Sequence, residues 1–268
     1  MRQRMKKKAE IKIGDAFRHG KAFIGFVTGG DPSIEKSEEF VLKMVQAGCD
    51  LIEIGIPFSD PIAEGPVIQE ANLRALSAGA TTDRLFGLAA GVREKTDVPL
   101  VFLTYLNPVF RYGYEAFCAK CEEAGVNGII LPDMPYEEKQ EFLPYAEAHK
   151  VDIISLIAPT SERRIRMIAS EAKGFVYVVS SMGVTGVRSE INTNLDKIIA
   201  AVKGVTDVPA AVGFGVSTPE QAAEIARTAD GVIVGSAIVS LIAQYGEDAG
   251  EYIYDYVKKM KAALMKES

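Results

Sequence analysis

Short apolar runs rich in β-branched residues alternate along this chain with longer segments whose apolar residues recur at helical spacing. The short runs predict eight strands, at 22–28, 51–55, 100–105, 128–131, 153–157, 175–180, 210–213 and 231–234. The segments between them, such as 33–48 and 136–150, predict amphipathic helices that pack one face against a sheet. A further amphipathic helix is predicted before the first strand, over residues 8–19.

Eight strand–helix units without a break in composition indicate one (β/α)8 barrel, the TIM-barrel architecture. We expect residues 1–268 to form this single domain, with an extra N-terminal helix, short inserted helices and a frayed basic segment at 1–8. An open doubly wound sheet is the alternative. The count of eight units, together with glycine-rich turns after the last two strands, favours the barrel.

The predicted strand at 51–55 contains an ionisable side chain, Glu53, among apolar neighbours. Such a group is costly to bury without a partner, and buried acids are often kept for chemistry. Two further acids, Asp60 and Glu64, follow on a loop punctuated by proline and glycine. One fixed and two loop carboxylates can supply a general acid and a general base. The alternative is a buried glutamate held by backbone donors, with surface acids beside it.

Glycine-rich turns follow the seventh and eighth strands. After the seventh strand, Ser217 is expected to cap the next helix, with Glu220 completing a capping box, and Gly215 allows a close approach to an anion. After the eighth strand, Gly235 and Ser236 open another helix. Paired turns at these two places form a recurring phosphate site in (β/α)8 barrels, and helix starts offer free N–H groups to it.

The net charge of −6 argues against a nucleic-acid-binding surface. No apolar run reaches the roughly 18 residues that a membrane helix needs, so no membrane association is expected. The first ten residues carry five basic groups, but no apolar segment of a signal peptide follows them. These features predict a cytoplasmic protein.

The chain offers little for metal or histidine chemistry. Cys118 and Cys121 form a C-x-x-C inside a helical pattern, without a second pair or a nearby histidine, and are expected to be ordinary helix-face cysteines. The two histidines, His19 and His149, are expected near helix ends. No metal is therefore expected, and the carboxylates are the main catalytic candidates.

Seven segments together have the form of a known family. They are FVTGGDP at 26–32, IEIGIPFSDPIAEGPVIQEANLRAL at 52–76, TYLNPVFRYG at 104–113, LPDMP at 131–135, SSMGVTGVRSE at 180–190, GFGVSTPEQ at 213–221 and GSAIV at 235–239. Through them the chain resembles the tryptophan synthase α subunit family over essentially its whole length. The second segment is long and unusual enough to be specific by itself.

The resemblance implies cleavage of indole-3-glycerol phosphate to indole and glyceraldehyde 3-phosphate. It implies no cofactor in this chain, and a β subunit partner that uses pyridoxal phosphate, in an α2β2 assembly. By the same resemblance, Glu53 is a catalytic acid, Glu64 takes up the indole N–H proton, and Tyr177 positions both acids. The implied apolar pocket is Phe26, Leu103, Tyr105, Ile130 and Ile157. Thr185 is the implied lid residue, and the phosphate site is Gly186, Phe214, Gly215, Gly235 and Ser236. Asp60 and Pro135 are expected to face the β subunit.

The chain departs from the family pattern at Glu64, where aspartate is usual. The carboxylate is kept, but its arm is longer by one C–C bond, about 1.5 Å. An uncompensated misplacement on that scale costs about a hundredfold in rate. Either the loop has adapted to the longer arm, or the chain cleaves poorly and serves mainly to bind and activate its partner. Another phosphate-binding barrel enzyme is the remaining alternative.

Overall fold

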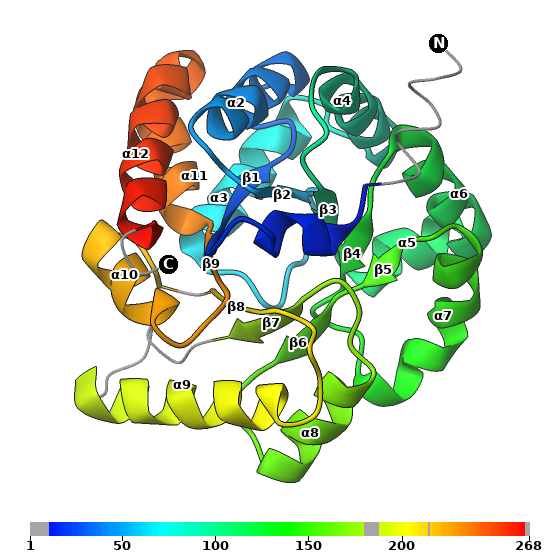
Figure 1. The fold of residues 1–268 in the computed structure, drawn as a ribbon. Helices are drawn as coiled ribbons and strands as arrows, with labels where there is room; N and C mark the ends of the chain where they lie inside the picture. Colours follow the sequence, from blue (N-terminus) through cyan, green and yellow to red (C-terminus); the bar gives the residue numbers. More distant parts are fainter. Residues whose placement is uncertain (1–10, 180–187, 214, 266–268) are drawn as a thin grey trace.

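The computed structural model describes residues 11–179, 188–213 and 215–265, and its parallel strands curve into a nearly closed barrel surrounded by helices (Figure 1). The strands are β1 Ala22–Thr28, β2 Leu51–Gly55, β3 Leu100–Leu103, β4 Gly128–Ile130, β5 Asp152–Ile153, β6 Ser155–Ile157, β7 Val176–Val179, β8 Ala210–Gly213 and β9 Gly231–Val234. Their order in the sheet is β5-β4-β3-β2-β1-β9-β8-β7-β6. The predicted (β/α)8 barrel is therefore confirmed.

The ninth strand arises because the fifth predicted run is divided. β5 pairs with β4, whereas β6 pairs with β7, so one short stretch of chain joins the two ends of the sheet. Ile154 lies between the two strands, and its N–H donates to the Ile129 carbonyl at 2.9 Å. The barrel closes here by a change of partner within one segment.

Helices follow the strands and cover the outside of the barrel (Figure 1). The α-helices are α2 Ile34–Gln46, α3 Pro66–Ser77, α4 Thr82–Lys95, α5 Leu106–Tyr112, α6 Tyr114–Ala124, α7 Lys139–Ala148, α8 Glu162–Ser170, α9 Arg188–Lys203, α10 Pro219–Ala226, α11 Ser236–Tyr245 and α12 Ala249–Leu264. Three short 3-10 helices are η1 Ile13–Phe17, η2 Tyr136–Glu138 and η3 Gly246–Asp248. Two helices follow β2, β3 and β9, which confirms the predicted insertions. In the described ranges, no helix is both long and apolar enough to cross a membrane.

The predicted N-terminal helix is much shorter than 8–19, and its described part is only the 3-10 turn η1 (Figure 1). The backbone N–H of Lys12 donates to the Asp15 carboxylate at 3.0 Å, which starts the turn. Ile13 is then buried at the base of the barrel, where a Cβ on Gly128 would be only 2.7 Å from its side chain. The turn is short because only Ile13 and Ala16 are buried against the strands.

Both faces of β2 are covered, one by the barrel interior and the other by helices, as its apolar sequence predicts. Leu51 packs among the side chains that fill the barrel interior, while Ile52 and Ile54 pack in the layer between sheet and helices. Because side chains alternate along a strand, Glu53 shares the interior face of Leu51. The fold thus places one carboxyl inside the barrel, near the end of its strand.

Two smaller predictions have different outcomes. The N-cap of α10 is Thr218 and its capping-box partner is Gln221, so Ser217 and Glu220 were wrong by one residue. Pro219 explains the shift, because proline is favoured at the first helical position and the cap must precede it. The two cysteines of α6 are both buried in the sheet–helix layer, as predicted for helix-face residues.

Candidate active site

A cavity of about 460 Å³ lies at the carboxyl ends of β1, β2, β3, β7 and β9. Its lining includes eight residues expected at the site: Phe26, Glu53, Glu64, Leu103, Tyr177, Gly215, Gly235 and Ser236. Functional groups of (β/α)8 barrels gather at this end, where strands run into the following loops. The structure therefore brings most of the predicted residues together.

Glu53 is the most buried ionisable group of the cavity, with 1% of its surface exposed. In the sheet it is level with Phe26 of β1 and Val101 of β3. Its Oε1 has no hydrogen-bond partner among the described residues. Burial raises the pKa of Glu53 from 4.5 to about 8. The carboxyl is therefore mainly protonated at neutral pH and can donate a proton into the cavity.

Glu64 is half-buried on the loop after β2. The Asn72 side-chain amide of α3 donates to its Oε2 at 2.6 Å, and the Gln69 side chain donates to its carbonyl at 2.8 Å. The Tyr105 hydroxyl accepts from the neighbouring Ala63 N–H at 3.1 Å. Burial raises the pKa of Glu64, while hydrogen bonds from Asn72 and Tyr105 oppose that rise. These donors favour the ionised form, which suits a base.

Tyr177 of β7 forms one wall of the cavity. Its ring lies against Gly213, where a Cβ would be 2.4 Å from the hydroxyl oxygen, so only glycine fits there. Burial, together with the nearby charge of Glu53, raises the pKa of Tyr177 well above its ordinary value. The residue therefore stays a neutral phenol and can position neighbouring groups without ionising.

The other end of the cavity is formed by glycines and hydroxyl groups. Gly215 has a φ of +75°, and Gly235 immediately precedes α11, whose first residue is Ser236. Free N–H groups at a helix start attract anions. No lysine or arginine is among the described residues that line this cavity. The described part of this wall offers an anion backbone N–H groups and the hydroxyls of Ser217, Ser236 and Ser240.

Several predicted residues do not line the cavity. Tyr105 is buried and supports the Glu64 loop, while Ile130 packs in the barrel interior. Ile157 packs between sheet and helices, because its neighbour Leu156 takes the inward face of β6. Asp60 and Pro135 are exposed. Thr185, Gly186 and Phe214 lie outside the described residues.

Three residues of the site were missed from the sequence: Ile68, Asn72 and Ile233. Ile68 and Ile233 line the cavity, and Asn72 is buried with 4% of its surface exposed. Ile68 and Asn72 are four residues apart on α3, so they share one helix face. An asparagine on the apolar face of a predicted helix was the available signal. For Ile233, the signal was its place midway between Gly231, the first residue of β9, and Gly235, the residue that follows the strand.

Comparison with known proteins gives a consistent result along the whole chain. The family model described as "Tryptophan synthase alpha chain" matches residues 15–266. A tryptophan synthase alpha chain of Lacticaseibacillus casei is 48% identical over 253 residues, 94% of this chain and 95% of the relative. That of Lactiplantibacillus plantarum is 50% identical over 249 residues, 92% and 94% of the two chains. The crystal structure of tryptophan synthase subunit alpha from Legionella pneumophila has a TM-score of 0.85 at 35% identity, covering 98% of each chain.

Proposed function

The chain belongs to the tryptophan synthase α chain family, the lyase subunit of tryptophan biosynthesis, and we propose that its strand-end cavity cleaves indole-3-glycerol phosphate to indole and glyceraldehyde 3-phosphate. The observation that carries this proposal is the pair of unlike carboxyl groups facing one cavity. Glu53 is buried without a described partner for Oε1, whereas Glu64 is held by a hydrogen bond from Asn72. Such a difference in environment separates an acid from a base.

The chemistry needs both groups. The protonated Glu53 carboxyl gives its proton to ring carbon C3, while the Glu64 carboxylate takes the indole N–H proton, which produces the indolenine tautomer. The Glu53 carboxylate then takes the proton of the adjacent side-chain hydroxyl. The bond between C3 and the glycerol carbon breaks, its electrons return to the ring, and Glu64 returns the proton to nitrogen. Both carboxyl groups end as they began.

The other walls of the cavity hold the substrate in position against the two carboxyl groups. The apolar side chains of Phe26, Leu103 and Ile68 suit an indole ring, and the turns at Gly215 and Gly235 suit a phosphate. Phosphate binding at a distance from the reacting bond contributes energy that holds the ring against both acids. We assign the phosphate of the substrate to backbone N–H groups and the Ser236 hydroxyl.

We further propose that a β subunit carrying pyridoxal phosphate covers the strand-end face in an α2β2 assembly and uses the indole. Two large apolar side chains support such a partner: Ile62 on the Glu64 loop is 78% exposed, and Phe110 of α5 is 67% exposed. Asp60 and Pro135 are exposed and are assigned to the same interface. We also propose a cytoplasmic location for the protein. We propose that residues 1–268 form one domain, because the described strands form one sheet.

Glu53→Gln tests the proposed reaction, because it keeps the volume of the side chain and removes its proton. General acid–base catalysis is worth about 10²–10⁴-fold, so indole release should fall at least a hundredfold. Glu94→Gln, at an exposed position of α4, is the matched control and should keep the parent rate. A folded Glu53→Gln variant that retains more than about a tenth of the parent rate would exclude Glu53 as the acid. Assays of the parent with and without the β subunit separate an active enzyme from a weak subunit.

A further inference from the structure

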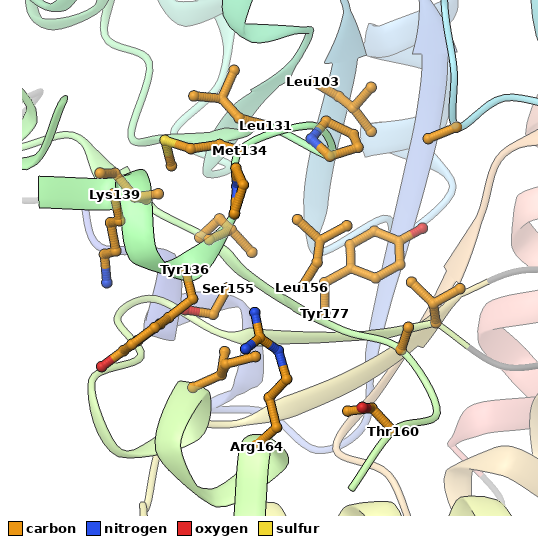
Figure 2. Close-up of a pocket in the computed structure, with 18 of the residues that line it drawn as sticks. Leu103, Leu131, Met134, Tyr136, Lys139, Ser155, Leu156, Thr160, Arg164 and Tyr177 are labelled. Atoms are coloured by element: carbon orange, nitrogen blue, oxygen red, sulfur yellow. The ribbon is translucent and has the colours of Figure 1, made fainter. Parts of the chain in front are cut away.

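Open space borders the Glu64 side chain on two sides. Glu64 lines the candidate-site cavity and also an adjoining hollow of about 560 Å³, and Leu103 and Tyr177 line both. Figure 2 shows Leu103 and Tyr177 at the wall of this adjoining part of the site. Packing alone therefore does not fix the position of the Glu64 carboxylate, and its hydrogen bonds must do so.

The helix α3 supplies those hydrogen bonds. Among the residues that the structure describes, the side chains of α3 form hydrogen bonds at two places. Gln69 and Asn72 donate to Glu64, at 2.8 and 2.6 Å. Closer to the end of the helix, Arg74 donates to both carboxylate oxygens of Asp31, from Nε to Oδ1 at 2.9 Å and from Nη2 to Oδ2 at 2.8 Å. The helix thus connects Glu64 to the turn that follows β1.

Asp31 belongs to a turn that is held on several sides. Its N–H donates to the Thr28 carbonyl at 3.3 Å, and the Ser37 hydroxyl of α2 donates to its carbonyl at 3.4 Å. A Cβ on the neighbouring Gly30 would be 2.7 Å from the side chain of Ala80, three residues after α3. The turn is therefore a fixed point against which the helix can be aligned.

The Asp31–Arg74 pair is better suited to fixing geometry than to adding stability. The Asp31 side chain is 0% exposed and that of Arg74 is 36% exposed. Removing a carboxylate from water offsets much of the attraction between the two charges, so a buried pair is a weak source of stability. A planar guanidinium bound to both carboxylate oxygens fixes orientation as well as distance.

We propose that Arg74 is a positioning residue for the cleavage reaction: it fixes α3 against Asp31 and, through Asn72, places the Glu64 carboxylate in the cavity. Asn72 and Arg74 are two residues apart, so they project from different sides of the helix. Because α3 is one continuous helix over Pro66–Ser77, a shift at Arg74 also moves Asn72. The role in catalysis rests on the proposed function of Glu64 as the base.

Two measurable effects should follow from loss of the Arg74 contact. Burial raises the pKa of Glu64, and the hydrogen bonds from Asn72 and Tyr105 oppose that rise. Weakening the bond from Asn72 should therefore move the titration of Glu64 to higher pH. A displacement of about 1 Å costs up to about a hundredfold in rate, so kcat should fall about fivefold or more.

The test combines Arg74→Met with Asn72→Ala. Carbon NMR follows the titration of the Glu64 carboxyl group, which is identified by its absence in Glu64→Gln. Arg74→Met should move this titration to higher pH in the parent but add no further shift in the Asn72→Ala background. Arg166→Met is the matched control, since Arg166 pairs with Glu162 at 2.9 Å on the surface of α8, and it should leave the titration unchanged.

Steady-state kinetics of indole release give the second readout. Arg74→Met should lower kcat about fivefold or more in the parent, but less than about twofold in the Asn72→Ala background, because residues acting in one chain of contacts are not additive. Arg166→Met should keep the parent kcat. If Arg74→Met does not fold by circular dichroism, it is replaced by the combination of Asp31→Asn with Arg74→Met, which leaves no buried charge.

An unchanged Glu64 titration in a folded Arg74 variant would overturn the proposal. Equal losses of kcat in the two backgrounds would also overturn it, because they would show that Arg74 acts on the fold and not through Asn72. The titration requires no turnover. A parent protein that releases no indole would therefore refute the proposed function, while the titration would still decide whether Arg74 positions Glu64.

Discussion

Replacing Glu53 by glutamine should stabilise the fold increasingly as the pH rises from about 6 to about 8. The folded protein holds a proton on Glu53 up to about pH 8, whereas the unfolded chain releases it near pH 4.5. Between these values the folded state binds more protons than the unfolded state, so the free energy of unfolding falls as the pH rises. The stability contributed by protonated Glu53 is complete below pH 4.5 and is lost through the folded pKa of about 8. Glutamine does not titrate and avoids this loss.

The size of this change in the free energy of unfolding follows from the difference between the folded and unfolded pKa values of Glu53. Each pKa unit corresponds to about 1.4 kcal/mol, so the loss is about 2 kcal/mol at pH 6 and about 4 kcal/mol at pH 8. The advantage of Glu53→Gln over the parent should therefore grow by about 2 kcal/mol across this interval. A buried glutamine amide carries its own desolvation cost, but that cost is the same at both pH values and cancels in the comparison.

Urea unfolding of both proteins at the two pH values measures this difference through the midpoint and the slope m. Glu94→Gln should show no such growth, because Glu94 is exposed on α4. An advantage of Glu53→Gln that is the same at both pH values would mean that Glu53 is ionised throughout, and the assignment of a buried neutral acid would be refuted.

Three further outcomes are expected. Glu64→Asp should lower kcat by about tenfold to a hundredfold, because the arm shortened by about 1.5 Å no longer reaches Asn72; an equal or higher kcat would show that the loop is not adapted to glutamate. Gly213→Ala should lower the urea midpoint and kcat, because its Cβ would be 2.4 Å from the Tyr177 hydroxyl oxygen, and an unchanged variant would contradict that packing. Adding the β subunit at saturating substrate should raise indole release at least tenfold, about 1.4 kcal/mol of coupling; equal rates with binding confirmed would exclude activation.

The parts of the fold that depend on alternation could be predicted from the sequence. β1, β2, β8 and β9 have the predicted bounds, because their apolar runs end at residues that also end the pairing. The division of the fifth run at Ile154 could not be predicted. It depends on which neighbour each half of the segment meets when the barrel closes, and no local pattern records that.

The candidate site was predicted in part for a similar reason. Glu53 was identifiable because a charged residue interrupts an apolar strand, and its position follows from strand alternation. The restraint of Glu64 was not identifiable, since it comes from Asn72 on α3 and from Tyr105 after β3. Those partners lie 8 and 41 positions away in the chain, and only the packed structure brings the latter to the loop.

The two carboxyl groups also explain each other. Burying Glu53 inside the barrel costs stability at neutral pH. It would help catalysis little if Glu64 moved freely, because the acid and the base must both be positioned at the same indole ring. The hydrogen bonds from Asn72 and Gln69 hold Glu64 by its side chain and its backbone, so the cost of ordering this end of the loop is met on folding. The part of the same loop at Asp60 and Ile62 is exposed, and this is where we propose that the partner binds. Activation by the β subunit should therefore act on that exposed segment and leave the Glu64–Asn72 contact unchanged.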